Sequence, residues 1–288
     1  MLCQSCLKYC LALSFLFQIS FAYKPVMLIH GILAYKDSML FIANRIKEVH
    51  PGTEVYLTNR FIGYSSLAPM WHQVEALGSD LMNISNAHPD GVHLIGYSQG
   101  GLLSRAVLEK FPDHNVKTFV SLSSPQAGQY GTNFLHLYFP NLWKKTAYEI
   151  FYSEIGQYTS VANYWNDPYH QQLYLKYSAF LAFANNDKSS NMSDIYRRGF
   201  EKLERLVLIG GPDDEVITPW QSSQFGYFDG NETVIEMKQR PIYQEDHIGL
   251  QTLDKSGRLH VITQPGNDHF SWHVNMTVID NFIIPYLD

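Results

Sequence analysis

Cysteine is almost missing from this chain of 288 residues. Its three cysteines are Cys3, Cys6 and Cys10, so all of them lie within the first ten residues. The rest of the chain offers no disulfide, no thiolate nucleophile and no cysteine ligand for a metal. A fold without disulfides has to be stabilised by its apolar core, and a chain of about 300 residues can do this because it buries roughly 75% of its unfolded surface.

Charge is scarce as well. Charged residues make up 17% of the chain, and the formal net charge is −6. A basic surface that binds phosphates is therefore not expected, and neither is a nucleic-acid partner. Long apolar runs, heptads and internal repeats are also lacking after the N-terminal segment, so we expect no transmembrane segment and a monomer with one globular domain.

Residues 1–22 have the pattern of a secretory signal peptide. Lys8 supplies positive charge, an apolar run follows, and Ser20 and Ala22 occupy the −3 and −1 positions of a cleavage site. The alternative is a membrane anchor, but the apolar stretch is about 12 residues and a spanning helix needs roughly 20. Cleavage after Ala22 would remove every cysteine.

Four N-glycosylation sequons follow, at Asn83, Asn191, Asn231 and Asn275. Each motif is weak alone, but four sequons behind a signal peptide favour a glycoprotein of the secretory pathway. We therefore expect these asparagines at the surface.

Short apolar runs alternate with longer amphipathic ones along residues 23–288. The expected strands are residues 25–29, 55–59, 92–96, 118–123, 206–209 and 259–263. The expected helices are residues 38–49, 71–86, 100–111 and 277–286. Apolar strands that alternate with helices indicate a mostly parallel central sheet with helices on both faces, which is the α/β class.

An aromatic-rich insertion at about 126–203 interrupts this alternation. Seventeen aromatic side chains lie between residues 134 and 200. Because the segment separates two core strands, it would form a cap with apolar walls over the sheet. The alternative is that the rings pack only against one another.

The most informative motif is Gly96-Tyr97-Ser98-Gln99-Gly100, a G-x-S-x-G sequence between an apolar run and a helical pattern. This strand–turn–helix context is that of a nucleophile elbow, in which the turn exposes the serine hydroxyl above the sheet. The helix N-terminus beyond Ser98 favours developing negative charge. Ser98 is therefore the candidate nucleophile.

A serine nucleophile needs a base and an acid, which in this architecture follow it in the order acid, then histidine. Asp214 heads a turn after an apolar strand and is the preferred acid, with Asp213 as the alternative. His269 lies on the loop after the last expected strand and is the preferred base. His273 is its competitor, and His247 is disfavoured because it precedes that strand.

Two backbone N–H groups would have to bind the oxyanion of an acyl-transfer reaction. Gln99 follows the nucleophile, and Ile32 lies on the His-Gly loop after the first strand, so these are the candidate donors. We expect His30 to order this loop by hydrogen bonding. No spacing typical of metal ligands occurs, so no metal and no other cofactor is expected.

Four segments together resemble the palmitoyl-protein thioesterases, and most closely the lysosomal palmitoyl-protein thioesterase 2 branch. They are HLIGYSQGGLLSRAVLE, LSSPQAGQYG, LIGGPDDEVITPWQSSQFGYFD and GNDHFSWH. The resemblance covers residues 24–287 and implies an α/β-hydrolase fold, with a Ser98, Asp214 and His269 triad. It further implies a glycoprotein of the secretory pathway, lysosomal or also secreted, that hydrolyses long-chain acyl thioesters, palmitoyl above all. Family members typically carry disulfides, which this mature chain cannot form.

The substrates expected from this resemblance are acyl-CoA or S-palmitoylated cysteine fragments. Two alternatives stay open. One is a lipase or carboxylesterase that acts on oxygen esters, because residue chemistry alone does not separate an ester from a thioester. The other is a non-catalytic lipid-binding protein of the same fold.

Overall fold

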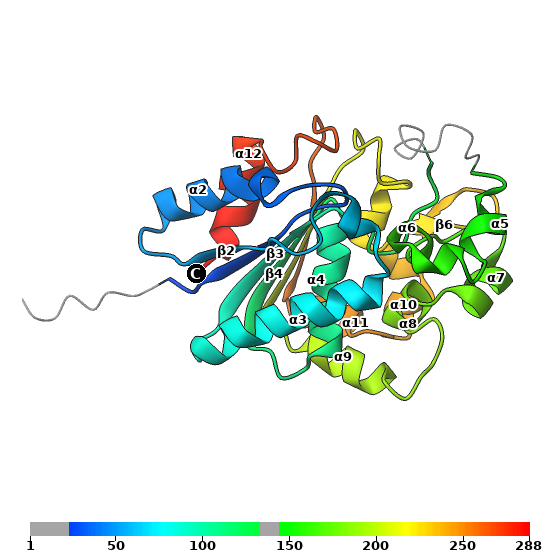
Figure 1. Ribbon diagram of the computed structural model, residues 1–288, viewed down its shortest axis with the longest axis horizontal. Helices are drawn as coiled ribbons and strands as arrows, with labels where there is room; N and C mark the ends of the chain where they lie inside the picture. Colours follow the sequence, from blue (N-terminus) through cyan, green and yellow to red (C-terminus); the bar gives the residue numbers. More distant parts are fainter. Residues whose placement is uncertain (1–22, 133–143) are drawn as a thin grey trace, which may run out of the picture.

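A computed structural model describes residues 23–132 and 144–288, and it contains a six-stranded parallel sheet (Figure 1). The strand order is β2-β1-β3-β4-β5-β8, and every neighbouring pair is parallel. The strands are β1 Val26–Ile29, β2 Val55–Leu57, β3 Val92–Tyr97, β4 Val116–Leu122, β5 Arg205–Gly210 and β8 Leu259–Thr263. The predicted α/β class is confirmed, whereas the predicted signal peptide lies outside the described residues.

Helices cover both faces of this sheet. They include α2 Leu40–Val49 and α12 Met276–Val278 on one face, and α3 Met70–Ala87, α4 Gln99–Lys110 and α9 Ser193–Glu201 on the other (Figure 1). Neighbouring strand residues point to opposite faces, so Val26 and Leu28 pack with the α2 side while Met27 and Ile29 pack with the α3 side. This two-sided burial explains why the inner strands read as apolar runs, whereas the edge strands β2 and β8 are only partly buried.

The C-terminal helix differs from its prediction. Residues 277–286 were expected to form one helix, but the chain passes from α12 into a π-helix, η7 Ile279–Ile283, and then a 3-10 turn, η8 Ile284–Tyr286. Pro285 lies in that last turn. Its ring and missing N–H prevent a regular α-helix from continuing through this position.

The other elements are short. Before β5 they are η1 Lys36–Met39, η2 Gly63–Leu67, α5 Ala147–Phe151, η4 Gly156–Tyr158, α6 Ser160–Asn163, α7 Gln171–Tyr177 and α8 Leu181–Ala184. After β5 they are η5 Trp220–Gln224, β6 Tyr227–Phe228, β7 Val234–Ile235, η6 Met237–Gln239, α10 Pro241–Gln244 and α11 Leu250–Lys255. The antiparallel β6–β7 pair was not predicted, since two-residue strands carry no periodic signal.

The described aromatic side chains between β4 and β5 pack against one another and against the rest of the fold, while residues 133–143 of the predicted insertion lie outside the described residues. Phe180 contacts Trp71 of α3, and Phe200 contacts Phe119 of β4. Trp165 is fully buried, with the ring of Phe151 5.0 Å and the ring of Tyr130 5.3 Å from its own. Tyr164 is different because it also lines a cavity beside Ser98. Helices α5 to α8 group beyond one end of the sheet, whereas α9 packs on α4 (Figure 1).

A buried ion pair ties α4 to this segment. Arg105 and Glu109 are both fully buried, with Arg105 Nη1 3.0 Å from Glu109 Oε1. The same guanidinium donates to the Ala184 carbonyl, the Asn185 side chain and both oxygens of Gln126. Burial raises the pKa of Glu109 to about 7, although Arg105 opposes the rise.

The raised pKa of Glu109 makes its own contribution to stability larger in acid. The folded state holds the Glu109 proton up to about pH 7, whereas the unfolded carboxyl, with its ordinary pKa of 4.5, releases it earlier. The contribution of Glu109 to the free energy of unfolding should therefore fall as the pH rises from about 4.5 to about 7. Glu109→Gln mimics the protonated form and should remove this contribution, so in urea unfolding at pH 5, 6 and 7.5 the variant should gain stability relative to the unmutated chain as the pH rises. A stability difference that does not change with pH would contradict the assignment.

Candidate active site

Ser98 lies at the sharp turn between β3 and α4. Its backbone angles are φ 54° and ψ −129°, in a region that residues other than glycine rarely adopt. Glycine is required on either side because a Cβ at Gly96 would lie 2.5 Å from the Gly100 carbonyl oxygen. A Cβ at Gly100 would lie 2.4 Å from the His30 carbonyl oxygen. The motif therefore folds as a close strand–turn–helix contact with the serine at its tip.

The structure brings the three predicted triad residues together. His269 Nε2 lies 2.9 Å from Ser98 Oγ, and His269 Nδ1 lies 2.8 Å from Asp214 Oδ2. Ser98 follows β3, Asp214 follows β5 and His269 follows β8. Because the carboxyl ends of parallel strands share one edge of the sheet, residues 171 and 55 positions apart meet there.

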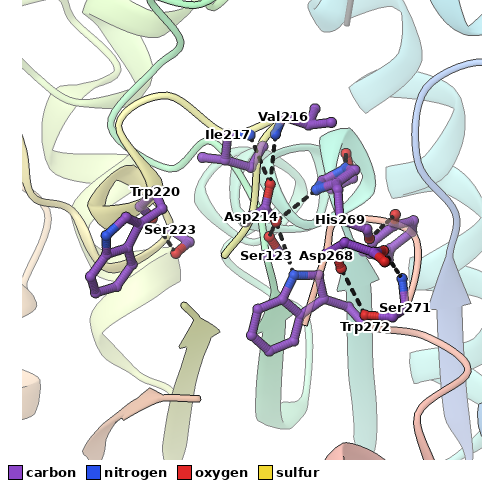
Figure 2. A network of polar contacts seen from close by, with 12 residues as sticks. Ser123, Asp214, Val216, Ile217, Trp220, Ser223, Asp268, His269, Ser271 and Trp272 are labelled. Atoms are coloured by element: carbon purple, nitrogen blue, oxygen red, sulfur yellow. Dashed lines mark hydrogen bonds and ion pairs between the residues drawn. The ribbon is translucent and has the colours of Figure 1, made fainter. Parts of the chain in front are cut away.

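Asp214 is held by a dense set of donors (Figure 2). Its Oδ1 accepts from the backbone N–H groups of Val216 at 3.0 Å and Ile217 at 2.9 Å. Its Oδ2 accepts from His269, from the Trp272 indole Nε1 at 2.9 Å and from the Ser123 hydroxyl. With donors on both oxygens, the carboxylate is held facing the imidazole.

The same contacts keep Asp214 ionised. Burial by itself would raise the pKa of this carboxyl, but hydrogen bonds from His269, Ser123 and Ile217 outweigh it and hold the pKa below its ordinary value. Asp214 is thus an anion next to His269, in position to stabilise a protonated imidazole.

The alternative residues lie apart from this contact chain. Asp213 accepts from the Gly266 backbone N–H at 2.6 Å and so supports the loop that carries His269. The His273 ring is tilted against the Tyr97 ring, with 4.5 Å between the ring centres. Its Nδ1 has no hydrogen-bond partner among the described residues, and burial lowers its pKa to about 4. His247 pairs with Glu245 instead.

Two residues at this site were not identified from the sequence. Ser123 follows β4, and Trp272 lies three residues after His269. Trp272 is fully buried, and its indole N–H donates to Asp214, which is 58 positions away in the chain. A tryptophan in a polar loop is a weak signal, and nothing local indicates its partner.

Ile32 and Gln99, the predicted donors of an oxyanion site, line one small cavity together with Ser98. The other lining residues are Pro125, Gln129, Tyr164, Val216 and Ile217. The volume is about 10 Å³, which is enough for about one water molecule. A long acyl chain would therefore need these walls to move apart.

The loop that carries Ile32 is braced from two directions. The His30 ring contacts the Gly31 carbonyl oxygen at 2.8 Å and the Arg60 carbonyl oxygen at 3.1 Å, which agrees with the ordering role expected for it. On the other side, the Leu33 N–H donates to Ser66 Oγ at 2.7 Å.

Ser66 in turn connects this loop to the elbow. Its carbonyl oxygen accepts from Gln99 Nε2 at 2.8 Å and from Gln73 Nε2 at 2.8 Å. One short turn, η2, is thus joined to the Ile32 loop, to the residue after Ser98 and to α3. This network fixes the spacing between the two candidate oxyanion donors.

Two further findings concern metals and membranes. Within residues 23–132 and 144–288, no group of three or more His, Cys, Asp or Glu side chains could hold a metal ion. Over the same residues, no helix combines the length and the apolarity that crossing a bilayer requires.

The four sequon asparagines differ in their surroundings. Asn83, Asn191 and Asn231 are exposed. Asn275 is half-buried and caps α12, since its side-chain oxygen accepts from the Thr277 N–H at 2.9 Å.

Comparisons with known proteins agree with this geometry. The family model described as palmitoyl protein thioesterase matches residues 25–269. The chain is 53% identical to the lysosomal thioesterase PPT2 homolog of Drosophila melanogaster, covering 94% of each chain. It is 46% identical to lysosomal thioesterase PPT2 of Rattus norvegicus, covering 92% of this chain and 88% of the relative.

Among solved structures, the mature form of the Bacillus licheniformis lipase BlEst2 matches with a TM-score of 0.51. The match covers 93% of each chain at 17% sequence identity, so it bears on the fold alone. It confirms the α/β-hydrolase fold. From the family model and these two relatives, we conclude that the chain belongs to the palmitoyl protein thioesterase family.

Proposed function

We propose that this chain is a lysosomal thioesterase that hydrolyses long-chain acyl thioesters, palmitoyl above all, by an acyl-enzyme mechanism. The observation that carries the proposal is the contact chain from Ser98 through His269 to Asp214, in a member of this family. Ser98 is the nucleophile, His269 the general base and Asp214 the residue that orients the imidazole. The substrates in view are acyl-CoA and S-palmitoylated cysteine fragments.

The distances support the following steps. His269 Nε2 takes the Ser98 hydroxyl proton as Oγ attacks the thioester carbonyl carbon, and Asp214 stabilises the resulting imidazolium. The N–H groups of Gln99 and Ile32 bind the oxyanion. The C–S bond then breaks, the sulfur takes the proton from His269, and the acyl group stays on Ser98.

A second half-reaction releases the acid. His269 removes a proton from water, whose oxygen attacks the acyl carbon, and the fatty acid leaves as Ser98 recovers its proton. A thiolate is a good leaving group, so help from His269 as a general acid matters less than it would for an ester.

The lysosomal setting is supported by the relatives' names and by the sequence pattern of residues 1–22. The exposed Asn83, Asn191 and Asn231 are compatible with glycosylation along the secretory route. The half-buried Asn275 is the fourth candidate glycosylation site.

The test compares two substrates with the same acyl chain. Purified enzyme should hydrolyse palmitoyl-CoA with a kcat/KM at least about tenfold above that for a matched oxygen ester of palmitate. An equal or higher value for the oxygen ester would indicate a lipase or carboxylesterase instead. No turnover of either, together with no labelling of Ser98 by a fluorophosphonate, would indicate a lipid-binding protein. A palmitoylated peptide as a third substrate tests the cysteine fragments.

A further inference from the structure

One open cavity of this chain is separate from the candidate active site. It is a groove of about 520 Å³ between strand β2 and helix α3, and none of its lining residues lines the cavity beside Ser98. Its walls include Met27, Tyr56, Leu57, Arg60, Asp80 and Asn83. Its volume lies within the range of about 300–1,000 Å³ that is typical of sites for small molecules.

The groove has an apolar floor and a polar rim. Met27 is buried, while the side chains of Tyr56 and Leu57 are half-buried. At the rim, Arg60 donates twice to Asp80, from Nε and Nη2, each at 2.9 Å. An apolar face next to clustered donors and acceptors suits a carbohydrate, whose rings have an apolar side and a hydroxyl-bearing edge.

Asn83 lies in the wall of this groove, one helical turn after Asp80. Its side chain is exposed, and it begins the sequon Asn83-Ile84-Ser85. A sugar attached to Asn83 Nδ2 would therefore start at the rim of the groove, within reach of the Tyr56 ring.

Ser85 supplies an independent observation. Its hydroxyl is buried and has no hydrogen-bond partner among the described residues. An unpaired buried hydroxyl destabilises a fold, and alanine would fit the same helix position at less cost. The hydroxyl has a chemical use, however, because the third residue of a sequon must be serine or threonine.

Strand β2 also has a reason to be covered. It is an edge strand of the sheet, and Val55, Tyr56 and Leu57 are only half-buried. Exposed apolar edge strands are templates for pairing with other chains, and proteins commonly shield them.

We propose that Asn83 carries an N-linked glycan whose first N-acetylglucosamine unit lies in this groove and covers β2. The bond forms between Asn83 Nδ2 and the anomeric carbon of the sugar. The bond from that carbon to the pyrophosphate of a lipid-linked oligosaccharide donor breaks, and the amide gives up one proton. This inference rests on the secretory route in the proposed function but not on its catalytic steps.

The first experiment uses the full chain secreted by a eukaryotic host that makes high-mannose glycans. Glycopeptide mass spectrometry should find Asn83 occupied. An endoglycosidase that leaves a single N-acetylglucosamine should keep the melting temperature, whereas an amidase that removes the whole glycan should lower it by about 2–4 °C. In Asn83→Gln the two treatments should give the same melting temperature. An unoccupied Asn83, or equal effects of both treatments on the unmutated chain, would overturn the proposal.

Variants separate the glycan from the buried hydroxyl. Asn83→Gln and Ser85→Ala both lack the glycan, but only Ser85→Ala also loses the unpaired hydroxyl. The unmutated chain should have the highest melting temperature, Ser85→Ala an intermediate one and Asn83→Gln the lowest. Ser85→Thr keeps the sequon and should keep the occupancy, while Asn191→Gln, which removes an exposed sequon outside the groove, should not change the melting temperature. A melting temperature of Asn83→Gln equal to that of Asn191→Gln would contradict the proposal.

Hydrogen exchange and turnover complete the test. Removing the Asn83 glycan should speed exchange in β2 more than in β4, because β4 lies inside the sheet. Palmitoyl-CoA hydrolysis should be unchanged in all these variants, since the groove shares no residue with the cavity beside Ser98. Absent hydrolysis in every form would contradict the proposed function and leave the glycan proposal standing.

Discussion

Replacing Ser98 with alanine should lower the turnover of palmitoyl-CoA by a factor of about 10⁶. The variant lacks the hydroxyl that lies 2.9 Å from His269 Nε2, and the alanine side chain has no atom that could form the acyl-enzyme. Because the described chain contains no cysteine, a thiolate cannot take over. Steady-state hydrolysis with free-thiol detection measures the loss.

The fold should tolerate this change. Alanine keeps the Cβ of Ser98 and leaves the backbone bond from its N–H to the Leu122 carbonyl oxygen, 2.9 Å long, in place. The melting temperature of Ser98→Ala should therefore stay near that of the unmutated chain, while labelling by a fluorophosphonate disappears. Retention of more than a small fraction of the activity would show that Ser98 is not the nucleophile.

Asp214→Asn should lower kcat by about 10⁴. The amide oxygen is expected to remain with the N–H groups of Val216 and Ile217, which bind Oδ1 in the unmutated chain. The amide NH₂ then faces His269 Nδ1 and the Trp272 indole N–H, both of which donate to Asp214 Oδ2 in the unmutated chain. To accept from this NH₂, His269 must carry its proton on Nε2, where it can no longer take the proton of Ser98.

The matched control is Asp213→Asn, next to it in the chain. The side chain of Asp213 accepts from the Gly266 N–H in the loop before His269 and makes no contact with the imidazole, so this variant should keep activity within about tenfold of the unmutated enzyme. The pair of variants decides between the two acids that the sequence left open. A larger loss in Asp213→Asn than in Asp214→Asn would reverse the assignment.

The elbow could be predicted from the sequence because all its determinants are local. An apolar strand, two glycines that allow close approach and a helical pattern lie within a few residues of Ser98. The same holds for the core strands, whose two-sided burial makes them readable as apolar runs. The prediction of one regular helix over residues 277–286 was wrong, because Pro285 and the packing of the last turns override the periodic pattern there.

The donors around Asp214 could not be predicted in this way. Ser123 and Trp272 reach the carboxylate from the ends of two other strands, and sequence distance carries no information on such contacts. Likewise, the groove at Asn83 forms between α3 and the edge strand β2, and no local sequence pattern indicates that these two elements lie side by side.

By itself, the sequence determined which chemistry was available. With its cysteines confined to the first ten residues, it left serine as the nucleophile, and its strand–turn–helix motif placed that serine at an elbow. Only the tertiary structure decided which aspartate turns inward, which histidine meets Ser98 and which further donors hold the acid. The physical reason is the parallel sheet, which brings the carboxyl ends of β3, β5 and β8 to one edge and so assembles side chains far apart in the chain.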